Sequence, residues 1–273
     1  MGKHTMIRRA IDKKKSLMIG VLSILVLMGF YSLVSHWQHQ KNPDDSTIPT
    51  WTQLGQGVQK IIEVNPRSDE RWIVVDSKAT MSRLFLGLFF GVAGAVVIGL
   101  LMGCFTPFEA FLAPPMSLLA KVPPTAALAV FFVLAGTDTR MYVAMISFGV
   151  LPTLAQSIYL AVKEVPDETL YKAYTLGASQ TELIWNIILR HIMPKMLDAV
   201  RLQIGPAMVY LIAAEMVVGD VGFGYRIRLQ SRLLNMNVVY PYLAVLAAFG
   251  FFMDVLLRRT QHIFFRWYTH GKR

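Results

Sequence analysis

Two acidic residues, Glu215 and Asp254, interrupt long apolar stretches of this chain and are the first candidates for chemistry. If these stretches cross a membrane, a charge at mid-bilayer costs about 2.5 to 3.5 kcal/mol on insertion scales, so such residues usually face a cavity or a partner. Asp254 stands one helical turn before Arg258, and we expect an ion pair between them. For Glu215 three roles stay open: a gate, a polar contact between subunits, or a residue placed at the membrane interface.

Motifs for catalysis are absent from the sequence. It contains no Gly-x-x-x-x-Gly-Lys phosphate loop, no His-Glu-x-x-His metal pair and no Gly-x-Ser-x-Gly elbow. Gly222-Phe223-Gly224 lacks the third glycine of a dinucleotide site and predicts a turn. A single cysteine, Cys104, excludes an internal disulfide and every multi-cysteine metal or redox motif. We therefore expect a chain that is not an enzyme and binds no metal or cofactor itself.

Composition predicts a membrane protein. The 273 residues are 54% hydrophobic and only 16% charged, which is too apolar for an ordinary soluble domain. The net charge of +10 comes from basic residues that flank the apolar runs, a pattern typical of membrane topology and lipid contact rather than of nucleic-acid binding.

Six charge-poor runs are candidate transmembrane helices, since crossing about 30 Å of hydrocarbon takes about 20 residues. They are Ser16 to Ser35, Leu84 to Phe108, Phe111 to Ala135, Met141 to Val162, Leu202 to Val218 and Tyr240 to Leu257. In the second, Gly91, Gly94 and Gly99 favour close helix contact. The third carries four prolines, and we expect it to be kinked or broken near its start.

Basic residues predict the orientation. They collect before the first span and after the last, so we expect both termini in the cytoplasm and the loop before Leu202 there as well. Arg226, Arg228 and Arg232 would then lie outside, against the trend. The predicted parts are a cytoplasmic tail (1–15), a first span (16–35), an extracytoplasmic segment (36–80), a core (81–257) containing a cytoplasmic loop (163–201), and a cytoplasmic tail (258–273).

The extracytoplasmic segment contains one predicted helix. Apolar residues recur at helical spacing from Trp51 to Ile62, after Thr50, which suits an N-cap. We expect this helix to lie on the membrane surface or on neighbouring spans.

The cytoplasmic loop predicts two separately capped short helices between Val165 and Pro194. Pro166 and Asp167 favour the start of the first, and Gly177 favours its end. Ser179 and Glu182 have the spacing of a capping box that starts the second. Such a hinged pair suits docking into a groove of a partner.

The stretch Lys172 to Ser179, followed by an apolar helix and Pro194, resembles the signature cytoplasmic loop of permease subunits of binding-protein-dependent ABC importers, of the nitrate/sulfonate/taurine type. The resemblance implies an all-α type I permease fold in a bacterial inner membrane and a coupling contact with an ATPase. It assigns that contact to Tyr171, Lys172, Ala173, Gly177, Ala178, Ser179, Glu182 and Pro194. This loop departs from the family at Tyr171-Lys172, where Glu-Ala is usual, and at Arg190, where proline is usual.

The resemblance also implies partners: a second permease copy, two ATPase subunits that bind ATP and Mg, and an extracytoplasmic solute-binding protein. The solute is a small polar molecule or anion, with nitrate, a sulfonate, taurine, bicarbonate and nitrogenous precursors left open. Candidates for the translocation path or gate are Lys121, Pro123, Pro124, Gln156, Ser157, Gln203 and Glu215. A secondary transporter or channel is the alternative, and a membrane scaffold or enzyme is a third class.

Overall fold

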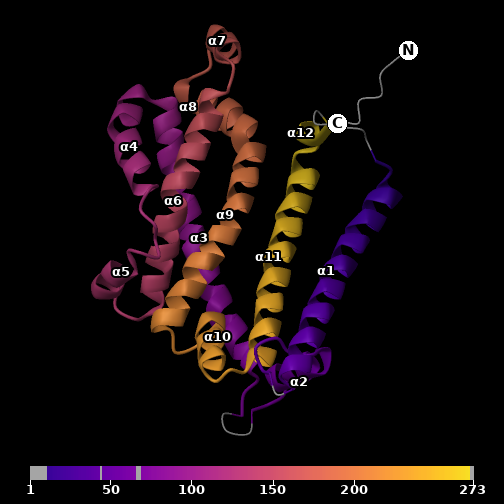
Figure 1. Cartoon of the computed structure of the whole chain (residues 1–273). Helices are drawn as coiled ribbons and strands as arrows, with labels where there is room; N and C mark the ends of the chain where they lie inside the picture. Colours follow the sequence, from indigo (N-terminus) through magenta and orange to yellow (C-terminus); the bar gives the residue numbers. More distant parts are fainter. Residues whose placement is uncertain (1–10, 44, 66–68, 271–273) are drawn as a thin grey trace.

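The computed structural model describes residues 11–43, 45–65 and 69–270, which are almost entirely helical (Figure 1). The helices are α1 (Lys13–Lys41), α2 (Trp51–Ile62), α3 (Trp72–Cys104), α4 (Thr106–Leu119), α5 (Leu128–Ala135), α6 (Thr139–Lys163), α7 (Asp167–Thr175), α8 (Gln180–Glu182), the π-helix η1 (Leu183–Ile188), α9 (Leu189–Val218), α10 (Phe223–Arg232), α11 (Met236–Phe264) and α12 (Arg266–His270). Within these residues there is no strand, only an isolated bridge between Val64 and Arg71. The predicted all-α class is confirmed.

Five helices of the described chain are long and apolar enough to cross a membrane: Lys14–Lys41, Trp72–Cys104, Thr139–Lys163, Gln180–Val218 and Met236–Phe264. Four of them contain the predicted first, fourth, fifth and sixth spans. The second span begins earlier than predicted, because Trp72 and the charged residues up to Arg83 already belong to α3. Charge alone therefore did not mark the start of this helix.

The predicted third span is two helices, α4 and α5, separated by residues 120–127. The break falls at Pro123-Pro124 and not near the start, where Pro114 and Pro115 are accommodated inside α4. Both pieces lie along α6: Glu109 of α4 contacts Tyr159, and the ring of Phe131 in α5 lies 5.4 Å from that of Phe148.

Small residues of α3 make its contact with α6. Gly87, Gly99 and Gly103 face Ile146, Ile158 and Val162, and a methyl group at any of these glycines would overlap the facing side chain. The difference in residue number between each of these glycines and the residue that it faces is constant, which shows that α3 and α6 run in the same direction. Gly91 and Gly94 meet α6 in the same way, which confirms the predicted close packing.

The second helix of the predicted loop is not short. α8, η1 and α9 continue into one another as a single helical segment, Gln180–Val218, of 39 residues. Pro194 lies inside α9 rather than after a helix. The predicted capping box is present, but a cap fixes only where a helix begins, and this helix continues through Pro194 and Pro206 to Val218.

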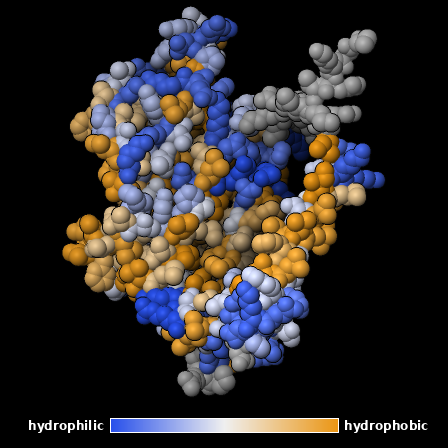
Figure 2. All heavy atoms as spheres, viewed as in Figure 1, coloured by the Kyte–Doolittle hydropathy of each residue, from blue (hydrophilic) through white to orange (hydrophobic). Residues whose placement is uncertain are grey.

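The helices give the molecule two ends. α7 projects at one, the end at which α12 and the start of α1 also lie, and α2, α5 and α10 lie at the other (Figure 1). These are named the α7 end and the α10 end. Figure 2 shows polar residues gathered at both ends of the visible face and apolar residues between them. The start of α1 and the helix α12 thus lie at the same end of the molecule as the predicted cytoplasmic loop.

α2 begins as predicted, with a capping box between Thr50 and Gln53. It packs against α11 at Gly57, whose position leaves no room for a side chain beside the Asn237 carbonyl. α1 is attached near its end through Tyr31, whose ring lies 5.3 Å from that of Trp51. None of the residues in the most apolar stretch of α1 is buried by the rest of the protein.

Candidate functional site

The α7 loop, residues 164–182, projects from the α7 end (Figure 1), and most of its residues are exposed. α7 begins after Pro166, and Asp167 and Glu168 fill its first turn, where acids complement the positive end of the helix dipole. At its other end the Ala178 N–H donates to the Ala173 carbonyl at 3.1 Å and the Gly177 N–H to Tyr174 at 2.9 Å. The helix is therefore closed before the chain continues.

Gly177 has a φ of +85°, in the left-handed region that glycine adopts without a steric penalty. Two residues later Ser179 and Glu182 form the predicted capping box: the Ser179 N–H donates to Glu182 Oε2 at 2.9 Å, and the Glu182 N–H donates to Ser179 Oγ at 3.3 Å. The hinge between two separately capped helices is confirmed.

Three large side chains of the α7 loop are exposed. Leu176 is 88% exposed, Tyr171 67% and Tyr174 49%. Isolated exposed apolar residues are ordinary, but an aliphatic and two aromatic groups on one short projecting helix are typical of a contact surface. Lys172 and Ala173 lie on the same helix, and Lys172 pairs only loosely with Glu168 at 3.9 Å.

Beneath α7 lies a cavity of about 260 Å³, lined by the ends of α3 and α6, by α7 and by the start of the next helix. An ion pair beside it joins Glu164, just after α6, to Lys195 in α9. The hydrogen bond from Lys195 lowers the pKa of Glu164. In the same region Lys163 lies 2.7 Å from Glu109 and lowers the pKa of that carboxylate.

Pro194 does not belong to the exposed loop. It is buried within α9, and its carbonyl accepts a hydrogen bond from Gln261 of α11 at 2.8 Å. The predicted ion pair of Asp254 and Arg258 is present at 2.8 Å, and Asp254 also accepts from Arg201 of α9 at 2.8 Å. These contacts join α9 to α11 near the α7 end.

At the α10 end, Glu215 is the centre of a buried polar network formed with Asp76, Thr80, Arg83, Arg226 and Tyr242. Its side chain is fully buried, and it accepts hydrogen bonds from Arg83 at 2.9 Å, from Thr80 at 3.0 Å and from the Gly224 N–H at 2.9 Å. Partners within the chain, not solvent, satisfy this buried carboxylate.

Asp76 is the second buried acid of the network. It accepts from Arg226 at 2.8 Å, from the Tyr242 hydroxyl at 2.7 Å and from the Gly222 N–H at 3.1 Å. Thr80 accepts from the Phe223 N–H at 2.9 Å. Three successive N–H groups at the start of α10 thus donate to side chains of α3 and α9. These hydrogen bonds attach the predicted Gly222-Phe223-Gly224 turn to both helices.

The same contacts explain two of the arginines that oppose the basic-residue trend. Arg226 is paired with Asp76, and Arg228 donates to the carbonyls of Val217 and Gly219 at the end of α9. Both charges therefore have partners within the folded chain.

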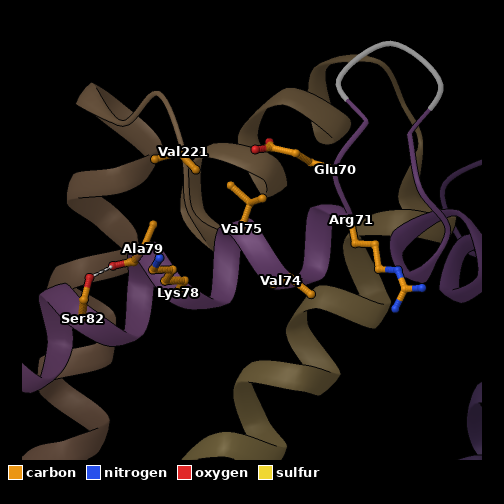
Figure 3. A pocket seen from close by; sticks show the side chains of 8 residues that line it. All are labelled: Glu70, Arg71, Val74, Val75, Lys78, Ala79, Ser82 and Val221. Atoms are coloured by element: carbon orange, nitrogen blue, oxygen red, sulfur yellow. Dashed lines mark hydrogen bonds between the residues drawn. The ribbon is translucent and has the colours of Figure 1, made fainter.

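A groove of about 650 Å³ lies beside the network on the outer surface of α3 (Figure 3). The labelled side chains come from the link before α3, from the first turns of α3 and, for Val221, from the link between α9 and α10. Lys78 and Arg71 give its rim positive charge, beside the acid Glu70.

The remaining predicted path residues fall in the middle of the molecule. Lys121 and Pro123 are exposed in the break between α4 and α5, and Pro124 is buried against Gly149 of α6. Ser157 is exposed, and its hydroxyl donates to the Thr153 carbonyl at 3.0 Å. Gln156 of α6 and Gln203 of α9 are partly buried on neighbouring helices. Glu215 is not with this group, since it belongs to the network at the α10 end.

The sequence interpretation missed Asp76, Thr80, Arg83 and Tyr242. A signal was available, because Asp76, Thr80 and Arg83 are spaced by four and three residues and so share one face of a helix. Their pairing with Glu215 and Arg226, more than 100 positions away, has no local signature.

Comparisons with known proteins agree with this architecture. Residues 94–265 match the family model described as binding-protein-dependent transport system inner membrane component. The taurine transport system permease protein TauC of Escherichia coli is 28% identical over 194 residues, which are 71% of this chain and 70% of that protein. The putative aliphatic sulfonates transport permease SsuC of Bacillus subtilis is 25% identical, covering 68% and 67%. The nitrate import permease NrtB of Synechocystis is 22% identical, covering 69% and 70%.

A solved structure of the methionine ABC transporter MetNI, in an inward-facing conformation, aligns with a TM-score of 0.64 at 16% identity, over 70% of this chain and 95% of that one. This likeness confirms the type I permease fold. With the family model matching more than half of its residues, the chain belongs to the inner membrane permease components of binding-protein-dependent ABC transport systems.

Proposed function

We propose that this chain is the permease subunit of an ATP-driven importer, and that the α7 loop docks into a groove of an ATPase subunit. The observation that carries this proposal is the single helical segment Gln180–Val218, which starts at the loop and ends at the Glu215 network. At 1.5 Å per residue it is about 58 Å long. A displacement of the loop therefore acts on the opposite end through one helix.

In this mechanism two ATPase subunits bind ATP and Mg and move together, carrying the α7 loops of two permease copies. α9 tilts, and because Glu215 binds Arg83 and the start of α10, α3 and α10 move with it. In such a mechanism the translocation path opens alternately to the two sides of the membrane. The inward-open and outward-open states must make different contacts with the ligand, since a ligand cannot shift an equilibrium between states that it binds equally.

The solute is proposed to be a small oxyanion or zwitterion, such as a sulfonate, taurine or nitrate, delivered by an extracytoplasmic binding protein. The support is the set of similar permeases, which carry those names. The groove of Figure 3 lies at the α10 end, the side that such a binding protein reaches if the α7 loop is cytoplasmic.

Affinity purification of the tagged protein from native membranes, followed by mass spectrometry, tests this function. We expect an ATPase and a solute-binding protein to co-purify, and the ligand of the latter to identify the solute. A homo-oligomer without an ATPase in mild detergent would contradict the proposal and favour a secondary transporter or channel.

A further inference from the structure

The cavity beneath α7 lies against one face of this helix. Asp167, Leu170 and Tyr174 of α7 line it. They are three and four residues apart, so they lie on the same side of the helix. The other lining residues come from α3, α6, the links beside them and the helix that follows the loop. At about 260 Å³ the cavity has room for several water molecules, each of which takes about 30 Å³ in the liquid.

α7 is loosely attached to the rest of the molecule. None of its nine residues is buried. Among the described residues its side chains bond only within the helix: Lys172 pairs with Glu168, and the Thr175 hydroxyl donates to the Lys172 carbonyl. α10, with ten residues, is the contrast, because side chains of α3 and α9 bind its first turn. Few contacts therefore oppose a movement of α7.

The connection that follows α7 is also suited to movement. Gly177 forms the hinge, and nothing lies within 4 Å of a Cβ added there. The next helical turns include the π-helix η1, in which the Leu189 N–H donates to the Ile184 carbonyl five residues earlier. π-helical turns are rare and occur frequently at functional sites. Leu183, Ile184 and Ile188 of η1 line the cavity, so this irregular turn is part of its wall.

We infer that the cavity is a seat into which α7 closes when the ATPase subunits close on ATP. This inference rests on the proposed function. Leu170 and the ring of Tyr174 then displace water from the apolar part of the wall, which stabilises the closed position. A loosely attached α7 would absorb a displacement of the ATPase. Once seated, α7 presses on η1 and transmits the displacement to the helical segment that begins at Gln180.

The test uses the complete complex with its ATPase and binding protein in lipid nanodiscs. Leu170→Cys places a thiol on the cavity side of α7, and Cys104, the single cysteine of this chain, lines the cavity at the end of α3. A disulfide requires the two Cα atoms to come within about 7 Å. With copper phenanthroline as oxidant, we expect the disulfide to form roughly fivefold faster, or more, with ATP and vanadate than without nucleotide. Mass spectrometry of the linked peptides measures the rate.

Thr169→Cys is the matched control, because Thr169 is exposed on α7 and does not line the cavity. It should link to Cys104 in neither state, and linking as fast as Leu170→Cys would show that α7 unfolds instead of closing. A Leu170→Cys disulfide that forms equally fast in both states, or more slowly with ATP and vanadate, would overturn the closing movement and leave the importer function intact. Failure of the unaltered permease to retain an ATPase would instead overturn the proposed function, and the movement with it.

Cys104→Phe gives a second measurement that needs no crosslink. The ring fills part of the cavity, so α7 cannot seat. We expect the ATPase to stay bound while the stimulation of ATP hydrolysis by the binding protein falls by roughly fivefold. Val133→Phe adds a similar volume on α5, where Val133 is 79% exposed, and should leave the stimulation within about twofold. Equal stimulation of the two variants would contradict a closing cavity.

Discussion

Glu215 of α9 accepts a hydrogen bond from Arg83 of α3 at 2.9 Å, although both side chains lie between apolar helices and are nearly or fully buried. The pair fixes the end of α9 farthest from the α7 loop to α3. Because Glu215 also binds the first turn of α10, one carboxylate joins three helices.

Removal of one partner from this pair should be strongly destabilising. Arg83→Met leaves Glu215 with an uncompensated buried charge, which typically costs about 3 to 5 kcal/mol. The double variant Arg83→Met/Glu215→Leu should lose less stability than the two single variants together. Thermal unfolding in detergent measures this. Arg258→Met, which breaks an exposed pair with Asp254, is the control and should cost at most about 1 kcal/mol. Equal losses for Arg83→Met and Arg258→Met would contradict a structural role for the buried pair.

Gly177→Asp should weaken the retention of the ATPase during purification, while the permease still inserts and folds. The substitution strains a backbone with φ of +85° and adds a charge at the hinge of the α7 loop. Gly136→Asp is a matched control, since Gly136 has φ of +74° and, like Gly177, open space around an added Cβ. Equal ATPase recovery with both variants would show that the hinge has no part in docking.

The packing of α2 on α11 can be tested with two glycines of one helix. Gly57→Ala places a methyl group against the Asn237 carbonyl, and we expect faster hydrogen exchange throughout α2. At Gly55 nothing lies near an added Cβ, so Gly55→Ala should slow exchange, because alanine favours a helix over glycine by about 1 kcal/mol. The prediction is wrong if both substitutions change exchange in the same direction.

Local signals in the sequence were sufficient for the hinge and for most helices. Gly177, the capping box of Ser179 and the cap at Thr50 depend only on neighbouring residues, and the structure has each of them. Long-range pairing was not predictable. α3 was assigned a late start because Asp76 and Arg83 are charged, and only the fold brings Arg226 and Glu215 to neutralise them.

The continuity of α9 illustrates a second limit. Pro194 suggested that the helix after the loop ends there, but its missing N–H is tolerated within a helix that is held by α11 through Gln261. Contacts with α11 therefore allow α9 to continue through Pro194, so that one helical segment connects the α7 loop to Glu215.

The ion pair between Glu164 and Lys195 should matter for energy coupling rather than for stability. It links the start of the α7 loop to α9, and both side chains are partly exposed, so its loss should cost at most about 1 kcal/mol. We expect Lys195→Met to reduce the solute imported per ATP hydrolysed while thermal unfolding changes little. Import per ATP that equals the unaltered complex would exclude this role for the pair.

The most direct measurement is photo-crosslinking from the α7 loop in intact membranes. A benzophenone amino acid at Leu176, which is 88% exposed, should form an adduct with an ATPase subunit, identified by mass spectrometry. The same group at Leu234, exposed just after α10, should not. Docking of the α7 loop on an ATPase predicts the adduct at position 176 alone. Efficient crosslinking at Leu176 to other proteins or lipid, with no ATPase adduct, would contradict it.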